Sequence, residues 1–344
     1  MRFRKSLTLT GIMAGLLSLA VATPALAGKT IDAIKARGQL VCGVNTGLAG
    51  FSAADSQGNW AGLDVDICKA IAASLLSDAT KVKWAPLNAQ QRFTALQSGE
   101  VDVLSRNTTF TLTRDASLGL LSTTPTYYDG QGFMVTKKSK ITSAKQLKNA
   151  EVCVQSGTTT EKNLNDYFKG QNIKIKPVVF DGFEASVKAF FSGRCQAYTT
   201  DASGLASIRN KEAKNPEDYV ILPELISKEP LGPMVRRGDE EFYAIVKWVV
   251  YALLEAEEYG ITQENADQMK TSTDPVVMRI LGTSEDTGKL LGLDKDWAYR
   301  AIKAVGNYGE IFERNVGPKS ALKLPRGLNN QWNKGGIQYA MPIR

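Results

Sequence analysis

Two segments of this chain, 95–107 and 189–201, follow one pattern and limit the possible folds more than any other feature. The first reads ALQSGEVDVLSRN and the second AFFSGRCQAYTTD. Each is typical of a helix end, a Ser-Gly cap, an apolar strand and a polar terminus. The two align without a gap and place Asn107 opposite Asp201. We therefore expect two lobes of similar design, each with polar groups at the carboxyl end of a strand, where open α/β sheets bind ligands.

The rest of the chain favours the α/β fold class, because helical and strand-like patterns alternate. The patterns predict helices at 30–37, 63–76, 91–98, 143–147, 184–191 and 242–258, and another that starts near Thr158. They predict strands at 40–45, 82–84, 101–104, 132–136, 151–155, 174–180, 195–199 and 219–222. Three further segments follow: an insertion at 260–296, a helical stretch at 297–315 broken near 306–309, and an irregular tail at 327–343.

The first 27 residues have the pattern of a secretory signal peptide. Three basic residues precede an apolar run at 7–22, and Ala25–Ala27 is a small-x-small cleavage site. Polar residues and glycines interrupt the run, so a retained membrane anchor is the weaker alternative. Cleavage after Ala27 leaves 28–344, a length that suits two domains, and implies that the protein is exported. The best later candidate for a membrane span, 242–254, is too short and contains a lysine.

Charge and residue types exclude several classes of partner. The formal net charge is +7, but the basic residues are scattered and form no stripe for nucleic acid. The chain has no histidine and no closely spaced cysteines, so we expect neither a zinc site nor a cofactor.

Four cysteines in an exported protein suggest two disulfides. Three pairings are possible, and free buried cysteines are the less favoured alternative. We favour Cys42–Cys68, which joins the first strand to the first long helix, and Cys153–Cys195, which joins two strands of one lobe.

The segment 101–132 joins an apolar strand to the polar run SRNTT at 105–109, and Arg114 follows. Arginine offers a planar donor fork to a carboxylate, and hydroxyls and amides fill its remaining lone pairs. A solvated loop explains any one of these residues better, but their grouping favours an anion site. In the other lobe, Thr158 and Glu161 have the spacing of a capping box. The N–H groups of such a helix start attract an anion, and a plain helix cap is the alternative.

These segments resemble a known family. GNWAGLDVDIC, ALQSGEVDVLSRNTTFTLTR, YYDGQGFMV, SGTTTE and SGRCQAYTTD are similar to bacterial extracellular solute-binding proteins of family 3, which serve polar amino-acid ABC transporters. The resemblance covers most of 36–260 and resumes at 297–315. It implies a type II periplasmic-binding fold, with two hinge strands and a ligand cleft between the lobes, and a periplasmic location. The first lobe would comprise 28–134 and 228–344, the second 135–227, and the hinge strands would lie at 128–136 and within 227–235.

The resemblance also implies roles for individual residues. The α-carboxylate of an L-amino acid would bind Arg114 with help from Asn107 and Thr109, and also Thr159 with Thr158 beside it. The α-ammonium would bind Asp201. A zwitterion removed from water needs both charges paired, so groups from two lobes would bind the ligand best when the cleft is closed.

Specificity depends on the side-chain end of the cleft. Family members that bind basic amino acids carry an acidic residue where this chain has Asn45, and aromatic residues where it has Leu48 and Ala89. A pocket without a fixed charge or tight sandwich discriminates poorly, which favours broad specificity. A narrow binder of glutamate, glutamine or aspartate is the alternative. The expected partners are the amino acid and an inner-membrane ABC permease and ATPase complex, and the expected state is a monomer.

Two other classes of function remain as alternatives. An enzyme is disfavoured, because the chain lacks histidine, the commonest general base, and a G-x-S-x-G elbow. Asp64 and Asp66 lie at a helix start, where a capping role is expected rather than paired acid-base chemistry. A periplasmic sensor or scaffold is the third alternative, and no signalling domain supports it.

Overall fold

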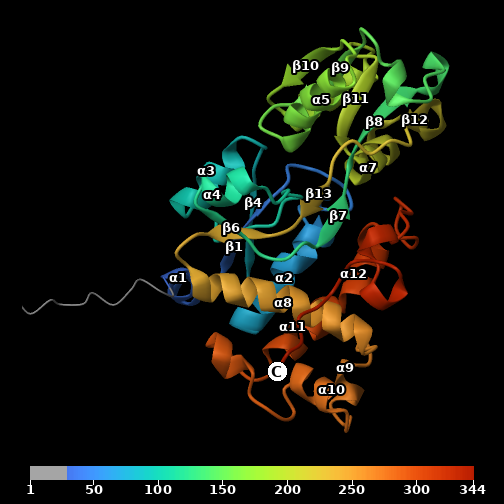
Figure 1. Cartoon of the computed structure of the whole chain (residues 1–344). Helices are drawn as coiled ribbons and strands as arrows, with labels where there is room; N and C mark the ends of the chain where they lie inside the picture. Colours follow the sequence, from blue (N-terminus) through green and yellow to red (C-terminus); the bar gives the residue numbers. More distant parts are fainter. Residues whose placement is uncertain (1–28) are drawn as a thin grey trace, which may run out of the picture.

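The computed structural model describes residues 29–344, which form two α/β lobes stacked along the long axis of the molecule (Figure 1). The signal-peptide prediction for 1–27 lies outside these residues. Each lobe contains a five-stranded sheet, with the orders β4-β1-β5-β14-β6 and β10-β9-β11-β8-β12. In each sheet the third strand runs parallel to the second and antiparallel to the fourth. The two lobes are thus built alike, as the repeated pattern predicts.

The first lobe begins with the expected alternation of helices and strands. Its elements up to β6 are α1 (Lys29–Arg37), β1 (Leu40–Val44), β2 (Ala53–Ala54), β3 (Trp60–Ala61), α2 (Leu63–Leu76), β4 (Val82–Pro86), α3 (Gln91–Ser98), β5 (Val103–Leu104), α4 (Leu112–Ala116) and β6 (Leu120–Ser122). A disulfide between Cys42 and Cys68 ties β1 to α2, as predicted. The short helix α4, which carries Arg114, was not predicted.

The second lobe follows the same plan. Its elements are β8 (Gln131–Thr136), β9 (Glu151–Gln155), α5 (Thr159–Gly170), β10 (Lys176–Phe180), α6 (Phe183–Phe191), β11 (Ala197–Asp201), α7 (Ala202–Glu212) and β12 (Tyr219–Ile221). The helix expected at 143–147 is a 3₁₀ turn, Ala144–Gln146. The second predicted disulfide, Cys153–Cys195, joins β9 to the loop before β11.

Two antiparallel strands, β7 (Tyr127–Asp129) and β13 (Glu229–Leu231), pair with each other between the sheets (Figure 1). After them the chain enters β8 of the second sheet and β14 (Met234–Arg236) of the first. The expected boundary between 134 and 135 falls inside β8, which pairs with β11 from 131 to 135. It therefore needs correction: hydrogen bonding assigns 131–134 to the second sheet, and the crossover lies at β7.

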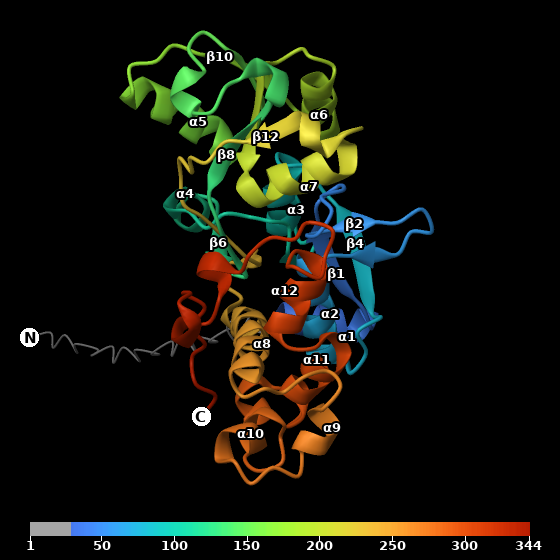
Figure 2. The ribbon, with the colours of Figure 1, turned by 90° about the vertical axis from the view of Figure 1, so that its right-hand side faces the viewer.

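The C-terminal third covers the first lobe. It comprises α8 (Glu240–Glu258), α9 (Ala266–Met269), α10 (Pro275–Ile280), α11 (Trp297–Val305) and α12 (Tyr308–Asn315). Helix α11 packs on α2 (Figure 2), and Trp297 at the start of α11 is buried. Gly306 and Asn307 separate α11 from α12, where the break was predicted. Within 29–344 no helix is both long enough and apolar enough to cross a membrane.

Candidate functional site

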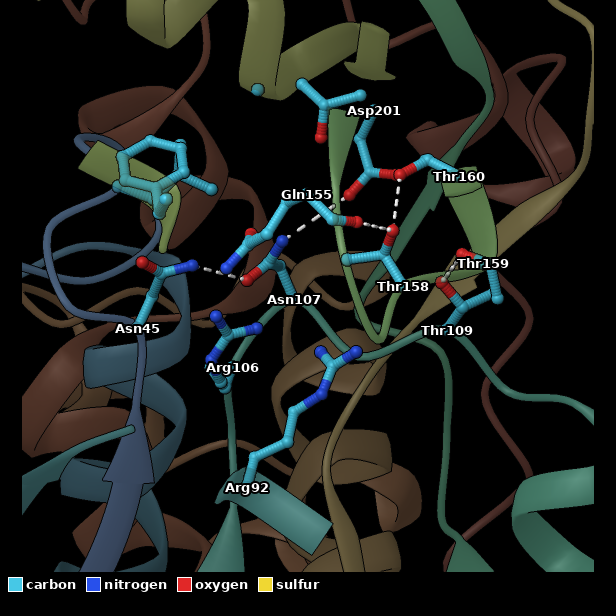
Figure 3. A pocket seen from close by; sticks show the side chains of 14 residues that line it. Asn45, Arg92, Arg106, Asn107, Thr109, Gln155, Thr158, Thr159, Thr160 and Asp201 are labelled. Atoms are coloured by element: carbon cyan, nitrogen blue, oxygen red, sulfur yellow. Dashed lines mark hydrogen bonds between the residues drawn. The ribbon is translucent and has the colours of Figure 1, made fainter. Parts of the chain in front are cut away.

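A cavity lies between the two lobes, at the carboxyl ends of their central strands (Figure 3). The first lobe contributes Asn45, Leu48, Arg92, Arg106, Asn107 and Thr109. The second lobe contributes Gln155, Thr158, Thr159, Thr160, Phe183, Thr200, Asp201 and Gly204. Six of the seven residues that the sequence nominates therefore line one cavity. The exception is Arg114.

The two aligned segments end face to face in this cavity. Asn107 Nδ2 lies 3.4 Å from Asp201 Oδ2, and Asn45 Nδ2 donates to Asn107 Oδ1 at 3.0 Å. Asn107 has φ +35°, a left-handed conformation that asparagine tolerates better than most residues. Its backbone N–H donates to the Asp64 carboxylate at 2.7 Å. These contacts fix the first-lobe side of the cavity.

The prediction that Asp64 and Asp66 cap a helix is wrong, because neither side chain bonds to the helix start. Asp64 is buried and holds Asn107 instead, and its burial raises its pKa to about 7. Asp66 accepts hydrogen bonds from Arg314 and Asn315 on α12. One carboxylate thus supports the cavity and the other ties α2 to the C-terminal layer.

Three threonines, Thr109, Thr158 and Thr159, lie together at one side of the cavity and form what we call the threonine wall. Thr158 caps α5 by accepting a hydrogen bond from the Glu161 N–H at 3.1 Å. The Glu161 carboxylate accepts from Gly157 rather than from Thr158, so the capping box is only half formed. Across the cleft, the hydroxyls of Thr159 and Thr109 lie 3.4 Å apart. This wall joins the second lobe to the first.

Arg114 lies behind this wall, on a neighbouring cavity that also includes Thr158 and Thr159. Its Nη1 donates to the Thr109 carbonyl at 2.6 Å, and its guanidinium lies 4.9 Å from the centre of the Phe93 ring. Burial lowers its pKa to about 10 and outweighs the nearby carboxylates, so it stays protonated at neutral pH.

Two further arginines, Arg92 and Arg106, line the main cavity, and the sequence reasoning missed both. The expectation of a pocket without a fixed charge is therefore wrong. Arg92 is only 3% exposed, and its Nε has no hydrogen-bond partner among residues 29–344. The sequence does contain a signal that Arg92 is buried, because Arg92 shares a helix face with Ala95 and Leu96, which belong to the core. Arg106 donates through Nε to the Leu87 carbonyl at 2.8 Å.

These guanidiniums have few counter-charges. Of the ion pairs within 29–344, none involves Arg92, Arg106 or Arg114. Burial lowers the pKa of Arg106 to about 10, and burial together with the other two guanidiniums lowers the pKa of Arg92 well below its usual value. An unpaired buried charge is expensive, so the arrangement is suited to receive an anion.

The carboxylate of Asp201 lies on the second-lobe side of the cavity, opposite the arginines of the first lobe. Burial, Asp129 and Glu229 raise the pKa of Asp201 well above its ordinary value, while Asn107 and Arg92 oppose the shift. A cation at Asp201 would relieve this destabilised carboxylate. The cavity can therefore hold a positive group near Asp201 and negative or carbonyl groups near the arginines. The described residues contain no cluster of metal-ligand side chains.

A family model and two similar proteins all indicate the same family for this chain. Residues 40–265 match the bacterial extracellular solute-binding proteins, family 3. The general L-amino acid-binding periplasmic protein of Rhizobium johnstonii is 58% identical over 95% of this chain and 96% of its own length. The glutamate/glutamine/aspartate/asparagine-binding protein of Rhodobacter capsulatus is 54% identical over 94% of this chain and 96% of its own length.

One solved structure is similar to this chain in both fold and sequence. The ABC transporter periplasmic binding protein from Brucella ovis, with glutathione bound, has a TM-score of 0.90 and 56% sequence identity, and the match covers 92% of this chain and 99% of that one. The chain belongs to the bacterial extracellular solute-binding proteins of family 3.

Proposed function

We propose that this protein captures free L-amino acids in the periplasm with broad specificity and delivers them to an inner-membrane ABC importer, without chemical turnover. The observation that carries the proposal is the cavity between two lobes, which opposes buried guanidiniums to Asp201. Relatives named as amino-acid binders, at more than half identity over nearly the full chain, support it. We further propose that a signal peptide is cleaved after Ala27 and that the mature protein is a monomer.

The α-carboxylate of the ligand would lie at the threonine wall. The start of α5 offers the backbone N–H groups of Thr159 and Thr160 to an anion there, and Arg114 lies directly behind. The hydroxyls of Thr109 and Thr159 donate their single protons to Glu229, so they line this end without donating to the ligand. The α-ammonium would lie at Asp201 beside Asn107, whose side-chain oxygen accepts a hydrogen bond from Asn45. Asn107 would thus serve this end of the ligand, rather than the α-carboxylate that the resemblance implied. In this arrangement the ligand contacts charged and polar groups of both lobes, so it stabilises the closed cleft over the open one.

The β7–β13 ribbon is the proposed hinge. It is the place where the chain crosses in both directions between the sheets. Residues 29–126 and 232–344 would move as one lobe and 131–227 as the other. Hinges of this kind need only a few residues to change conformation.

The role of Arg114 is tested by Arg114→Ala. We expect amino-acid binding to weaken by about 2–5 kcal/mol, or roughly 30-fold or more, because the carboxylate loses a desolvated charge partner. Calorimetric titration measures the change. Arg194→Ala is the matched control, because this arginine is about half exposed and pairs with Glu151 on the second lobe. Near-equal affinity in wild type and Arg114→Ala would contradict the assignment.

A second candidate is a narrower binder of acidic and amide amino acids, and one observation favours it. Two donors at the cavity, Arg92 Nε and Gln155 Nε2, are buried without a hydrogen-bond partner among the described residues. Buried donors without acceptors are rare and costly, so a ligand side chain with a carboxylate or carbonyl oxygen would satisfy them.

A panel of the twenty L-amino acids and glutathione, measured by thermal shift and calorimetry, separates the candidates. Stabilisation by many polar amino acids supports the broad binder. A response limited to glutamate, glutamine, aspartate and asparagine supports the narrow one. Absence of any response rejects the ligand class. Conversion of any ligand during incubation, followed by mass spectrometry, would indicate an enzyme.

A further inference from the structure

Glu229 is a buried carboxylate on hinge strand β13, and it lines neither of the two cavities. Its oxygens accept four side-chain hydrogen bonds. Oε2 accepts from the Thr109 hydroxyl at 2.5 Å and from the Thr159 hydroxyl at 2.9 Å. Oε1 accepts from the Ser227 hydroxyl at 2.6 Å and from Asn163 Nδ2 at 2.8 Å. Each oxygen of the Glu229 carboxylate therefore accepts two hydrogen bonds.

The donors come from three different parts of the molecule. Thr109 follows β5 of the first lobe, Thr159 and Asn163 lie on α5 of the second lobe, and Ser227 lies in the segment that leads to β13. Helix α5 packs on the sheet of the second lobe and would move with it in the opening proposed above. The complete set of four bonds therefore belongs to the closed cleft.

Glu229 also acts on the residues proposed to hold the α-carboxylate. The hydroxyls of Thr109 and Thr159 both donate to it, which fixes their side-chain rotamers from behind the cavity. Among the charges around Arg114, it is the carboxylate that most strongly favours the protonated guanidinium and so offsets the burial that lowers its pKa.

We propose that Glu229 is a hinge latch, which stabilises the closed cleft by joining Thr109 of one lobe to Thr159 and Asn163 of the other. The proposal rests on the amino-acid-binding function proposed above. In the open state water replaces the second-lobe donors, and hydrogen bonds to a buried charged acceptor are worth more than those to water. The difference biases the lobes toward closure and thus lengthens the residence time of the ligand. Glu229 is a positioning residue, because it need not touch the ligand.

Asn163 gives the sharpest test, because it bonds to Glu229 and lines the neighbouring cavity rather than the one proposed for the ligand. In Asn163→Ala we expect the amino acid to dissociate about 10-fold faster with an unchanged association rate constant, measured by stopped-flow fluorescence. Asn165→Ala is the control on the same helix, since Asn165 is exposed and bonds only to the Glu161 carbonyl. We expect its rates to equal those of wild type.

A second variant separates a latch from a purely structural contact. Glu229→Gln keeps the side-chain volume and removes the charge, and we expect it to weaken binding more than Asn163→Ala does. In the Glu229→Gln background, Asn163→Ala should have less effect than in wild type, because both act through one contact. A purely structural role would lower the melting temperature while the dissociation rate stayed the same, and would overturn the latch.

The outcomes distinguish the latch from the function on which it rests. Wild type that binds no amino acid overturns the proposed function and the latch together. Wild type that binds, with equal dissociation rates in Asn163→Ala, overturns the latch alone. An equally fast dissociation in Asn165→Ala would also overturn it, because the effect would then belong to α5 in general.

Discussion

At the scale of single residues, the buried arginines of the cavity lower the stability of the ligand-free protein. Arg92 is buried, lacks an ion pair within the described chain and has a bond at only one terminal nitrogen, Nη1 to the Thr108 hydroxyl at 3.3 Å. Arg106 and Arg114 add like charges nearby. A folded chain keeps such groups when a ligand satisfies them, so removal of the charge should stabilise the empty protein and impair the loaded one.

The Arg92→Met variant tests whether removal of this charge raises stability and weakens ligand binding. The unbranched methionine side chain fills the same space without a charge. We expect the free energy of unfolding of the ligand-free protein to rise by about 1–3 kcal/mol, measured by urea denaturation. Affinity for glutamate should fall more than affinity for alanine. The contrast is Arg236→Met, since the Arg236 guanidinium donates to Leu96, Val101 and Thr30 and its loss should destabilise. A destabilised Arg92→Met would contradict the account.

At the scale of elements, regular periodicity was enough to predict most of the fold. Helix α3 and strand β9 have the predicted bounds, because each begins and ends at a change of pattern. Helix α4 was missed because five residues are too few for a helical period to show. Strand β8 was found but was divided between the two lobes, since hydrogen-bond partners distant in sequence leave no trace in local periodicity.

The disulfides act within single lobes, and this leads to a prediction. Cys153 and Cys195 are 42 residues apart and join β9 to the loop before β11, away from the cavity. Replacing both by alanine should lower the free energy of unfolding of the second lobe by about 3–4 kcal/mol, because the unfolded chain gains freedom. Amino-acid affinity below the melting temperature should stay within a factor of about two. Urea denaturation and calorimetry measure the two quantities, and a large loss of affinity would show that the bond shapes the cleft.

At the scale of the whole molecule, the site is made by bringing two distant segments together. The repeated pattern predicted that Asn107 and Asp201 lie at equivalent strand ends, and the structure brings them within 3.4 Å. Arg92 and Glu229 were missed for a different reason. Arg92 lies on a helix face that contacts the core, and Glu229 lies on the three-residue strand β13 directly before Pro230. Local sequence does not show which groups from distant segments surround either side chain.

Closure also couples ligand binding to protons. The chain has no histidine, so titration between pH 5 and 8 belongs largely to perturbed carboxyl groups. Burial raises the pKa of Asp129 to about 6 and those of Asp64 and Glu255 to about 7, and the pKa of Asp201 is raised well above its ordinary value. Since these folded-state values exceed the unfolded ones, the folded protein binds more protons in this window. The stability of the ligand-free protein should therefore rise as the pH falls from 8 to 5.

Affinity should move in the opposite direction, because the α-ammonium of the ligand needs Asp201 ionised. We expect binding to release a proton and affinity to fall by at most about tenfold per pH unit as the pH decreases from 8 to 5. Calorimetry in two buffers of different ionisation enthalpy measures the proton release, and thermal unfolding gives the stability. Asp201→Asn should bind weakly at every pH and lose most of this slope. If wild type releases no proton near neutral pH and Asp201→Asn binds as tightly as wild type, Asp201 does not meet the ammonium and its proposed role fails.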